Sequence, residues 1–380
     1  MIEIKPLDTE GYLMPTRITF GRGSFGQVKD IREVEDARKL IVICGEHFKK
    51  SDEFGKLTKD LGEKVMPYNV FFKKSTFSTI NSFSQFCKEN IPDLIIAIGG
   101  GSILDTGKSG AVLATNGGKV EDYVQSKTKT LKEKGITFIA VPTTAGTGSE
   151  VTPWATVWGN DNLKYSLSSR ELMFPSVAIV DSVLTDKLPK EVTAESGIDA
   201  LTQAIEAYWS VKHNPISDEY ALDAIKIIMK NLKKAVNKPD KDTRDKMSFA
   251  SLKSGLAFSN TQTTICHSVS YPITAHWHVS HGQAVSITLP PFIEYILPVV
   301  DKFRRDKLLG ILDVSNEKEA SREIRKLMYG IGLKTKLSDL GISKEGLETI
   351  IYEGYNPDRA KNAPRVPSNE ELKEILLSIF

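Results

Sequence analysis

Short apolar runs alternate with polar stretches through the first half of the chain. Residues 94–98 are apolar at every position, which is typical of a strand covered on both faces. Alternation of such runs with helix-compatible stretches indicates βαβ units and predicts a mainly parallel sheet. We expect strands at residues 39–44, 64–72, 93–98, 137–141 and 176–181.

The pattern changes at about Leu188, where apolar residues begin to recur at helical spacing. Pro189 and Thr193 stand where a first helix can begin. The pattern therefore predicts an α/β domain over residues 1–187 and an all-α domain over residues 188–380. Within the second domain we expect helices at residues 200–209, 220–236, 247–257 and 311–331.

Composition is that of an ordinary globular protein. The chain has 380 residues, 40% of them hydrophobic, which is enough for a large core. Its 50 basic and 48 acidic residues leave a net charge of +2. Such a small charge produces no positive electrostatic field that would attract a nucleic acid. Three widely spaced cysteines and an N-terminus without a basic start and apolar run favour a cytoplasmic location. No run reaches membrane-spanning length, so we expect no membrane partner.

A glycine-rich loop follows the strand expected at residues 93–98. Gly99, Gly100, Gly101 and Ser102 come directly after it and before a helix-compatible stretch. Glycines at a strand-to-helix turn let backbone N–H groups approach a phosphate, and a helix N-terminus favours negative charge. The loop is therefore a candidate pyrophosphate cradle. A tight structural turn explains the same residues, and both interpretations stay open.

A second polar loop follows the strand expected at residues 137–141. It carries four hydroxyls, from Thr143, Thr144, Thr147 and Ser149, together with two glycines. Such groups can hold a ribose, a phosphate or a nicotinamide amide. Two loops at the carboxyl ends of strands in one sheet define one crevice, so the pair favours a dinucleotide site over plain connections.

Four motifs together carry a resemblance that covers nearly the whole chain. They are GGGSILDTGK at 99–108, PTTAGTGSEVT at 142–152, GIDALTQAIEAYWS at 197–210 and the histidine-rich stretch at 267–282. In these motifs the chain resembles the iron-containing alcohol dehydrogenase family. The resemblance implies a dinucleotide-binding α/β domain, then a helical metal and substrate domain, in a dehydroquinate synthase-like architecture with the active site between them. It also implies a homodimer that uses NAD(H) or NADP(H).

A divalent metal is held in that family by an Asp and a His one helical turn apart and by two further His. The matching positions here are Asp199, Gln203, His267 and His281. Spacing i, i+4 places Asp199 and Gln203 on one helix face. Gln203 departs from the family's histidine and offers only an amide oxygen, so we expect weaker binding or a harder ion, among Fe²⁺, Zn²⁺ and Mn²⁺. A polar cluster that works without a metal is the alternative.

The resemblance also implies cofactor contacts outside the two loops. NAD-preferring relatives carry an acidic residue after the first strand of the fold, where this chain has Gly45. Gly45 leaves room for a 2′-phosphate near Lys49 or Lys50, whereas Glu46 favours NAD. The choice between NAD(H) and NADP(H) therefore stays open. The cofactor-binding positions are Gly45, Gly99, Gly100, Gly101, Ser102, Asp105, Thr143, Thr144, Thr147, Lys164 and Val180.

Two further residues are candidates for the proton donor. Tyr271 stands where relatives often carry an additional histidine, and His278 lies in the same stretch. A tyrosine can donate a proton or bind a carbonyl, although a packed aromatic residue is an equally ordinary role. For His278 a surface position is the alternative.

The stretches at 155–167 and 267–282 look most like the branch of the family that reduces aldehydes with an anionic head group, such as sulfoacetaldehyde or phosphonoacetaldehyde. Arginine suits a sulfonate or phosphonate because it offers charge and several donors. The candidate substrate residues are Ser149, Val151, Arg359 and Arg365.

The expected function is NAD(P)H-dependent reduction of a small aldehyde to its alcohol, a reversible reaction. A simple short-chain alcohol or diol dehydrogenase is the nearest alternative. From other classes, a dehydroquinate synthase-like lyase and a non-catalytic dinucleotide sensor stay open, the second because of Gln203.

Overall fold

The computed structural model describes residues 11–68, 70, 72–355 and 357–380. The chain divides into two compact units, an α/β unit of residues 15–188 and a helical unit of residues 189–380. Residues 11–14 group with the helical unit, whereas the sequence pattern had placed them in the N-terminal domain.

The α/β unit is built on a six-stranded parallel sheet in the order β1-β8-β5-β4-β2-β3. Five of these strands match predicted runs, although β3 is shorter than expected and ends at Pro67, which has no N–H for a ladder. The four-residue edge strand β1 was not predicted. The strands are β1 (Arg17–Phe20), β2 (Leu40–Cys44), β3 (Val65–Pro67), β4 (Leu94–Gly99), β5 (Thr137–Pro142) and β8 (Val177–Val180).

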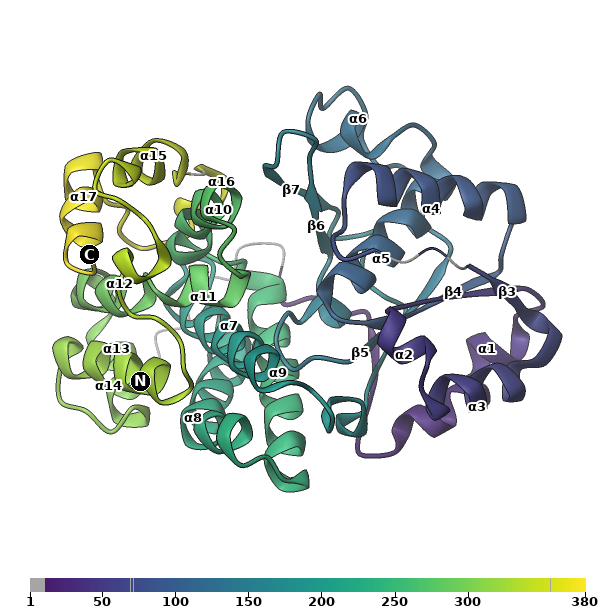
Figure 1. Cartoon of the computed structure of the whole chain (residues 1–380), viewed down its shortest axis with the longest axis horizontal. Coiled ribbons are helices and arrows are strands. Elements are labelled where there is room, and N and C mark those ends of the chain that lie inside the picture. The colour runs from purple at the N-terminus through teal and green to yellow at the C-terminus, as the bar shows by residue number, and fades with distance from the viewer. Residues whose placement is uncertain (1–10, 69, 71, 356) are drawn as a thin grey trace. The chain divides into compact units, whose positions relative to one another are not determined.

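Helices cover both faces of this sheet, as Figure 1 shows. Alternate strand residues point to opposite faces. Leu40 and Val42 therefore join a core with the first helices, and Ile41 and Ile43 join a second core with α4 and α5. This double burial is why the strands are apolar at nearly every position. The helices are α1 (Arg32–Asp36), α2 (Glu46–Lys49), α3 (Asp52–Leu61), α4 (Phe77–Asn90), α5 (Gly101–Asn116) and α6 (Val120–Val124).

A two-stranded antiparallel hairpin completes the α/β unit. It consists of β6 (Trp154–Trp158) and β7 (Lys164–Ser168) and was not predicted. Ala155, Val157 and Leu167 are buried in a third core that includes residues of α4, α5 and α6, while alternate residues are more exposed. The burial of β6 thus alternates as in a half-buried strand, although its sequence, WATVW, is apolar at every position except Thr156.

The helical unit is arranged around α7, which packs against α8, α9 and α11. Side chains are buried all round its second half, from Gly197 to Trp209. The helix expected at residues 311–331 begins only at Glu317, because residue 311 ends the preceding helix, Asp313 has a positive φ and Asn316 caps the new helix. The helices are α7 (Lys190–Trp209), α8 (Pro215–Asn237), α9 (Lys241–Thr261), α10 (Ile265–Trp277), α11 (His281–Ser286), α12 (Leu289–Ile296), α13 (Lys302–Ile311), α14 (Glu317–Gly330), α15 (Gly346–Glu353), α16 (Pro357–Ala360) and α17 (Asn369–Leu377).

Among the described residues, no helix combines the length and the apolar character that crossing a membrane requires. The α/β unit followed by a helical unit is the fold class that the sequence pattern predicted.

Candidate active site

The strand order places a ligand site at one end of the sheet. From β2 the chain continues to β3 on one side, then returns to place β4 on the other side of β2. Ligands of open α/β sheets bind at such a switch point, outside the carboxyl ends of the strands. The register pairs Cys44 with Ile98, so Gly45 and the glycines after β4 leave the sheet side by side.

The two polar loops predicted from the sequence lie against each other. Thr143 N–H donates to the Gly99 carbonyl at 3.0 Å. A Cβ on Gly101 would lie 3.0 Å from Thr147 Cγ2, and one on Gly100 would lie 3.4 Å from Thr144 Cγ2. Helix α5 begins at Gly101 without a side-chain cap, and the first N–H groups of a helix have no partner within it. The arrangement fits a pyrophosphate between the loops.

A buried lysine anchors the second loop. Lys108 Nζ donates to the backbone carbonyls of Ser149, Thr152 and Trp154 at 2.7, 2.8 and 2.8 Å. Burial lowers the pKa of this ammonium to about 8. Nearby, burial raises the pKa of the Glu150 carboxyl to about 7. The loop is therefore held from inside by the ammonium of Lys108, which is shielded from water.

Three predicted ligand contacts fall within this anchored region. Asp105 accepts from Ser149 Oγ at 2.7 Å and from Thr156 N–H at 2.9 Å, which holds the start of the hairpin to α5. Ser149 is buried, and Val151 is fully buried. These bonds give Asp105 and Ser149 a role in shaping the loop, and their contacts with a ligand, like that of Val151, stay predictions.

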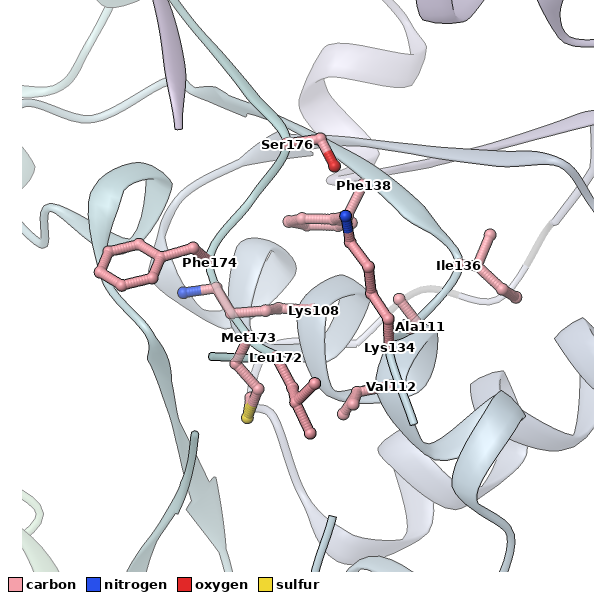
Figure 2. A pocket seen from close by; sticks show the side chains of 11 residues that line it. Lys108, Ala111, Val112, Lys134, Ile136, Phe138, Leu172, Met173, Phe174 and Ser176 are labelled. Carbon is pink, nitrogen blue, oxygen red and sulfur yellow. The ribbon is translucent and has the colours of Figure 1, made fainter. Parts of the chain in front are cut away.

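Lys108 also lines a small pocket together with residues of β5 and of the segment before β8 (Figure 2). Lys134, Phe138 and Met173 are among the other residues that line it. Its volume of about 20 Å³ is enough for one water molecule and too small for a nucleotide. The pocket is not the cofactor site.

The remaining predicted cofactor residues differ in their surroundings. Lys164, the first residue of β7, holds its ammonium 5.0 Å from the centroid of the Trp158 ring. Val180 ends β8 with its side chain buried, so a contact with a cofactor would come from its backbone. Glu46 forms an exposed ion pair with Lys50 at 2.7 Å, next to Gly45.

In the helical unit, three helices bring the four predicted metal ligands together. Asp199 and Gln203 lie one turn apart on α7, His267 is on α10 and His281 begins α11. Asp199 Oδ1 is 3.4 Å from His267 Nε2 and 3.9 Å from His281 Nε2. Ligands bonded at about 2.1 Å to one ion lie roughly 3.0–4.2 Å apart, depending on the angle between the bonds, so both distances suit a divalent cation. Within the described chain, Asp199, His267 and His281 form the one such cluster of acidic, Cys and His residues.

Two buried oxygens at this site lack a hydrogen-bond donor. Gln203 Nε2 donates to Asp199 Oδ2 at 3.0 Å. No described residue donates a hydrogen bond to Asp199 Oδ1 or Gln203 Oε1, which costs about 1–3 kcal/mol for each buried oxygen. A cation would satisfy both oxygens, and the two imidazoles complete a donor set of ordinary composition for Fe²⁺, Zn²⁺ or Mn²⁺. The residues therefore fit a divalent metal.

The field at the site is negative. Burial alone would lower the pKa of His267, but the carboxylates of Glu206 and Asp199 raise it to about 9. Glu206 was not among the predicted site residues, although it follows Asp199 and Gln203 on the same face of α7. Its spacing, seven residues after Asp199 and three after Gln203, was the signal in the sequence that could have identified it.

Gly282 determines how closely α11 approaches α7. A Cβ on this residue would lie 2.1 Å from the carbonyl oxygen of Glu195. Beside it, Ser280 Oγ donates to Glu195 Oε1 at 2.6 Å. Only glycine permits this contact, which brings the neighbouring His281 within reach of Asp199.

Tyr271 and Arg359 lie together next to the metal ligands. Tyr271 is one turn after His267 on α10, so the two side chains share a helix face. The Arg359 guanidinium lies 4.7 Å from the centroid of the Tyr271 ring and donates to Thr263 Oγ1 at 3.2 Å. A phenol and a guanidinium thus stand beside the ligand helix.

Arg365 and His278 are placed differently. Arg365 pairs with Glu371 at 2.6 Å and stacks on the Tyr295 ring, at an exposed position. His278 is the exposed C-terminal cap of α10, about 16 Å along the helix axis from His267. Along α10, Tyr271 is therefore closer to His267 than His278 is. The roles of His278 and Arg365 stay predictions.

The comparison with known families agrees with both halves of the chain. Residues 15–182 match the family described as iron-containing alcohol dehydrogenase, and residues 193–380 match the C-terminal part of the Fe-containing alcohol dehydrogenase family. The chain belongs to the iron-containing alcohol dehydrogenase family. The resemblance, the fold class and the enzyme class expected from the sequence are confirmed.

Individual relatives are named for different activities. Long-chain-alcohol dehydrogenase 1 of Geobacillus thermodenitrificans is 35% identical over 335 residues, which cover 85% of this chain and 84% of the relative. An aldehyde-alcohol dehydrogenase of Streptococcus pneumoniae is 31% identical over 96% of this chain, which spans only 45% of that longer protein. The solved structure of sulfoacetaldehyde reductase from Bifidobacterium kashiwanohense, in complex with NAD⁺, covers 99% of both chains at 31% identity with a TM-score of 0.91.

Proposed function

We propose that this protein is an NAD(P)H-dependent reductase that converts a small aldehyde into its alcohol, with a divalent metal at Asp199, Gln203, His267 and His281. The observation that supports it most is the pair of buried, unsatisfied oxygens on Asp199 and Gln203 beside two imidazoles. Polar atoms in that state need a cation or a strong donor.

The chemistry divides between bound groups and the chain. When bound, the metal ion polarises the aldehyde carbonyl, and the reduced nicotinamide supplies the hydride. The N-terminus of α5 and the loop at Thr143 to Thr147 hold the pyrophosphate and ribose of the cofactor. Tyr271 donates a hydrogen bond from its phenol Oη to the aldehyde oxygen, and its proton passes to that oxygen as the alcohol forms.

The substrate that we propose carries an anionic head group. Arg359 lies against Tyr271, one helical turn from His267, so a guanidinium stands a short distance from the place where the carbonyl would be held. A guanidinium binds a sulfonate or phosphonate through several donors at once. The sulfoacetaldehyde reductase of B. kashiwanohense shares the fold over the whole chain, which also supports this substrate class.

Both nicotinamide cofactors are compatible with the residues after β2. Gly45 offers no side chain to a ribose hydroxyl, and the Glu46 carboxylate is engaged by Lys50 at 2.7 Å. A 2′-phosphate would compete with Glu46 for Lys50. We therefore propose that the enzyme accepts NADPH as well as NADH.

Assembly and location are also proposals. We propose a homodimer, which the family resemblance supports. A cytoplasmic location is supported by Cys44, Cys87 and Cys266, which are all free and buried.

The test is steady-state oxidation of NADH and NADPH with a panel of aldehydes, including sulfoacetaldehyde, phosphonoacetaldehyde and propionaldehyde. We expect net oxidation in proportion to the alcohol formed, and faster turnover with the anionic aldehydes. Product formation without net NADH oxidation would indicate a lyase. Cofactor binding without turnover in any of Fe²⁺, Zn²⁺ and Mn²⁺ would indicate a dinucleotide sensor.

A further inference from the structure

We propose that Glu206 is a positioning residue, which holds the His267 ring by its Nδ1 atom so that Nε2 faces the metal. The proposal rests on the metal site described under the proposed function. It assigns a role to a residue that touches neither substrate nor cofactor in that function.

Glu206 is buried completely among groups that all donate to it. Its Oε1 accepts from Thr264 Oγ1 at 2.9 Å and from Cys266 N–H at 2.7 Å, and more weakly from His267 N–H at 3.3 Å. Its Oε2 accepts from His267 Nδ1. At 0% exposure, a carboxylate without such partners would cost several kcal/mol of desolvation.

The same carboxylate fixes the backbone that carries His267. Helix α10 has Thr264 at its N-cap position, but the Thr264 side chain makes no capping bond. Glu206, which belongs to α7, caps α10 instead, because it accepts from the N–H groups of Cys266 and His267 in the first turn of α10. Both the main chain and the ring of His267 are thus set by one residue of α7.

The bond to Nδ1 determines which ring nitrogen remains for a ligand. With Nδ1–H directed at Glu206, Nε2 is the ring nitrogen at which a metal can replace the proton, and Nε2 is the atom 3.4 Å from Asp199 Oδ1. A metal-bound histidine commonly donates its other N–H to a carboxylate, which fixes the ring and makes it a better donor. Asp199 and Glu206 belong to the same helix, so α7 supplies a ligand and also orients a second one.

The orientation of Glu206 is itself supported by α7. Trp209 Nε1 donates to Thr264 Oγ1 at 2.8 Å, which directs the Thr264 hydroxyl proton toward Glu206. Trp209 therefore donates to Thr264, Thr264 donates to Glu206, and Glu206 also accepts from His267 at the metal site. A carboxylate that served only to stabilise the helix would not need the contact with the ring.

The first test measures metal affinity by competition with a chelator, for Zn²⁺ and Fe²⁺, in the wild type and in Glu206→Gln. We expect the variant to bind each ion 10- to 100-fold more weakly, roughly the range for loss of such a partner. Thr264→Val is a graded comparison, because it removes one buried bond to Glu206 and leaves the contact between Glu206 and His267. We expect a smaller loss of metal affinity, about threefold, and a loss as large as that of Glu206→Gln would contradict a specific role for the bond to the ring.

A second measurement on the wild-type protein decides the question if Glu206→Gln does not fold. In Zn²⁺-loaded protein with ¹⁵N-labelled histidine, we expect His267 to bind the ion through Nε2 and to show a slowly exchanging, low-field Nδ1 proton. Binding through Nδ1, or a folded Glu206→Gln with unchanged affinity, would overturn the role of Glu206 alone. A wild-type protein that binds no metal would overturn this role and the proposed function together.

Discussion

Replacing Gly282 with alanine tests how the packing of α11 on α7 builds the metal site. The added Cβ would lie 2.1 Å from the Glu195 carbonyl oxygen and 2.7 Å from its carbonyl carbon, both of them backbone atoms. Contacts between carbon and a carbonyl oxygen are rarely closer than about 3.3 Å, so the two helices must separate by roughly 1 Å. No flexible side chain can absorb this shift.

The shift acts directly on His281, which precedes Gly282. Its Nε2 is already 3.9 Å from Asp199 Oδ1. Two ligands of one ion with bonds of about 2.1 Å can be at most roughly 4.2 Å apart, so a further 1 Å removes His281 from the site. We expect metal affinity to fall at least about tenfold, with a loss of about 1–3 kcal/mol in the free energy of unfolding from overpacking.

The assay is chelator competition on folded protein, with urea unfolding measured in parallel. Gly310→Ala is the control, because Gly310 lies in helix α13 with no atom within 4 Å of its added Cβ. Alanine there should stabilise the chain by about 0.5–1 kcal/mol and leave the metal affinity unchanged. A folded Gly282→Ala protein with wild-type metal affinity would refute the reasoning.

Three further predictions concern the loops and the substrate. Burial raises the pKa of Glu150 to about 7, so the free energy of unfolding should fall as pH rises from about 4.5 to 7, by up to about 1.4 kcal/mol per pH unit. Urea unfolding should show this slope in the wild type, and Glu150→Gln should lack it. Gly101→Ala places a Cβ 3.0 Å from Thr147, and we expect it to weaken NADH binding about tenfold in a fluorescence titration, whereas Gly55→Ala, at an open helical position, should leave the affinity unchanged. Equal affinities in the two variants would contradict a role of the glycine loop in cofactor binding. Arg359→Met should raise KM for sulfoacetaldehyde about 10- to 100-fold and leave propionaldehyde unaffected, and equal effects on both aldehydes would contradict anion recognition by Arg359.

Much of the fold could be predicted because the signals were local. The runs at β2, β4, β5 and β8 are apolar for their full length, since helices cover both faces of the sheet. The hairpin of β6 and β7 was missed, because its half-buried pattern is short and depends on packing with α5 and α6. The start of α14 has a local signal, the N-cap residue Asn316. The apolar periodicity that continues on both sides of Asn316 concealed this signal.

The residues of the site likewise divide into those that sequence motifs identify and those that depend on contacts between distant parts of the chain. The metal ligands Asp199, Gln203, His267 and His281 were expected from family motifs, and the structure brings them together. Glu206 was missed because its role depends on a contact with His267, which is far away in the sequence. The buried network of Lys108 was missed for the same reason, since its partners are backbone carbonyls that no sequence motif reveals.

The most direct test of a metal-assisted reductase is a titration of Fe²⁺ into chelator-treated protein while NADH oxidation by sulfoacetaldehyde is followed. Mass spectrometry first verifies that the starting protein holds no metal. We predict that this protein is inactive and that its rate rises to a plateau near one ion per chain. Full activity in the verified metal-free protein would contradict the role assigned to Asp199, Gln203, His267 and His281.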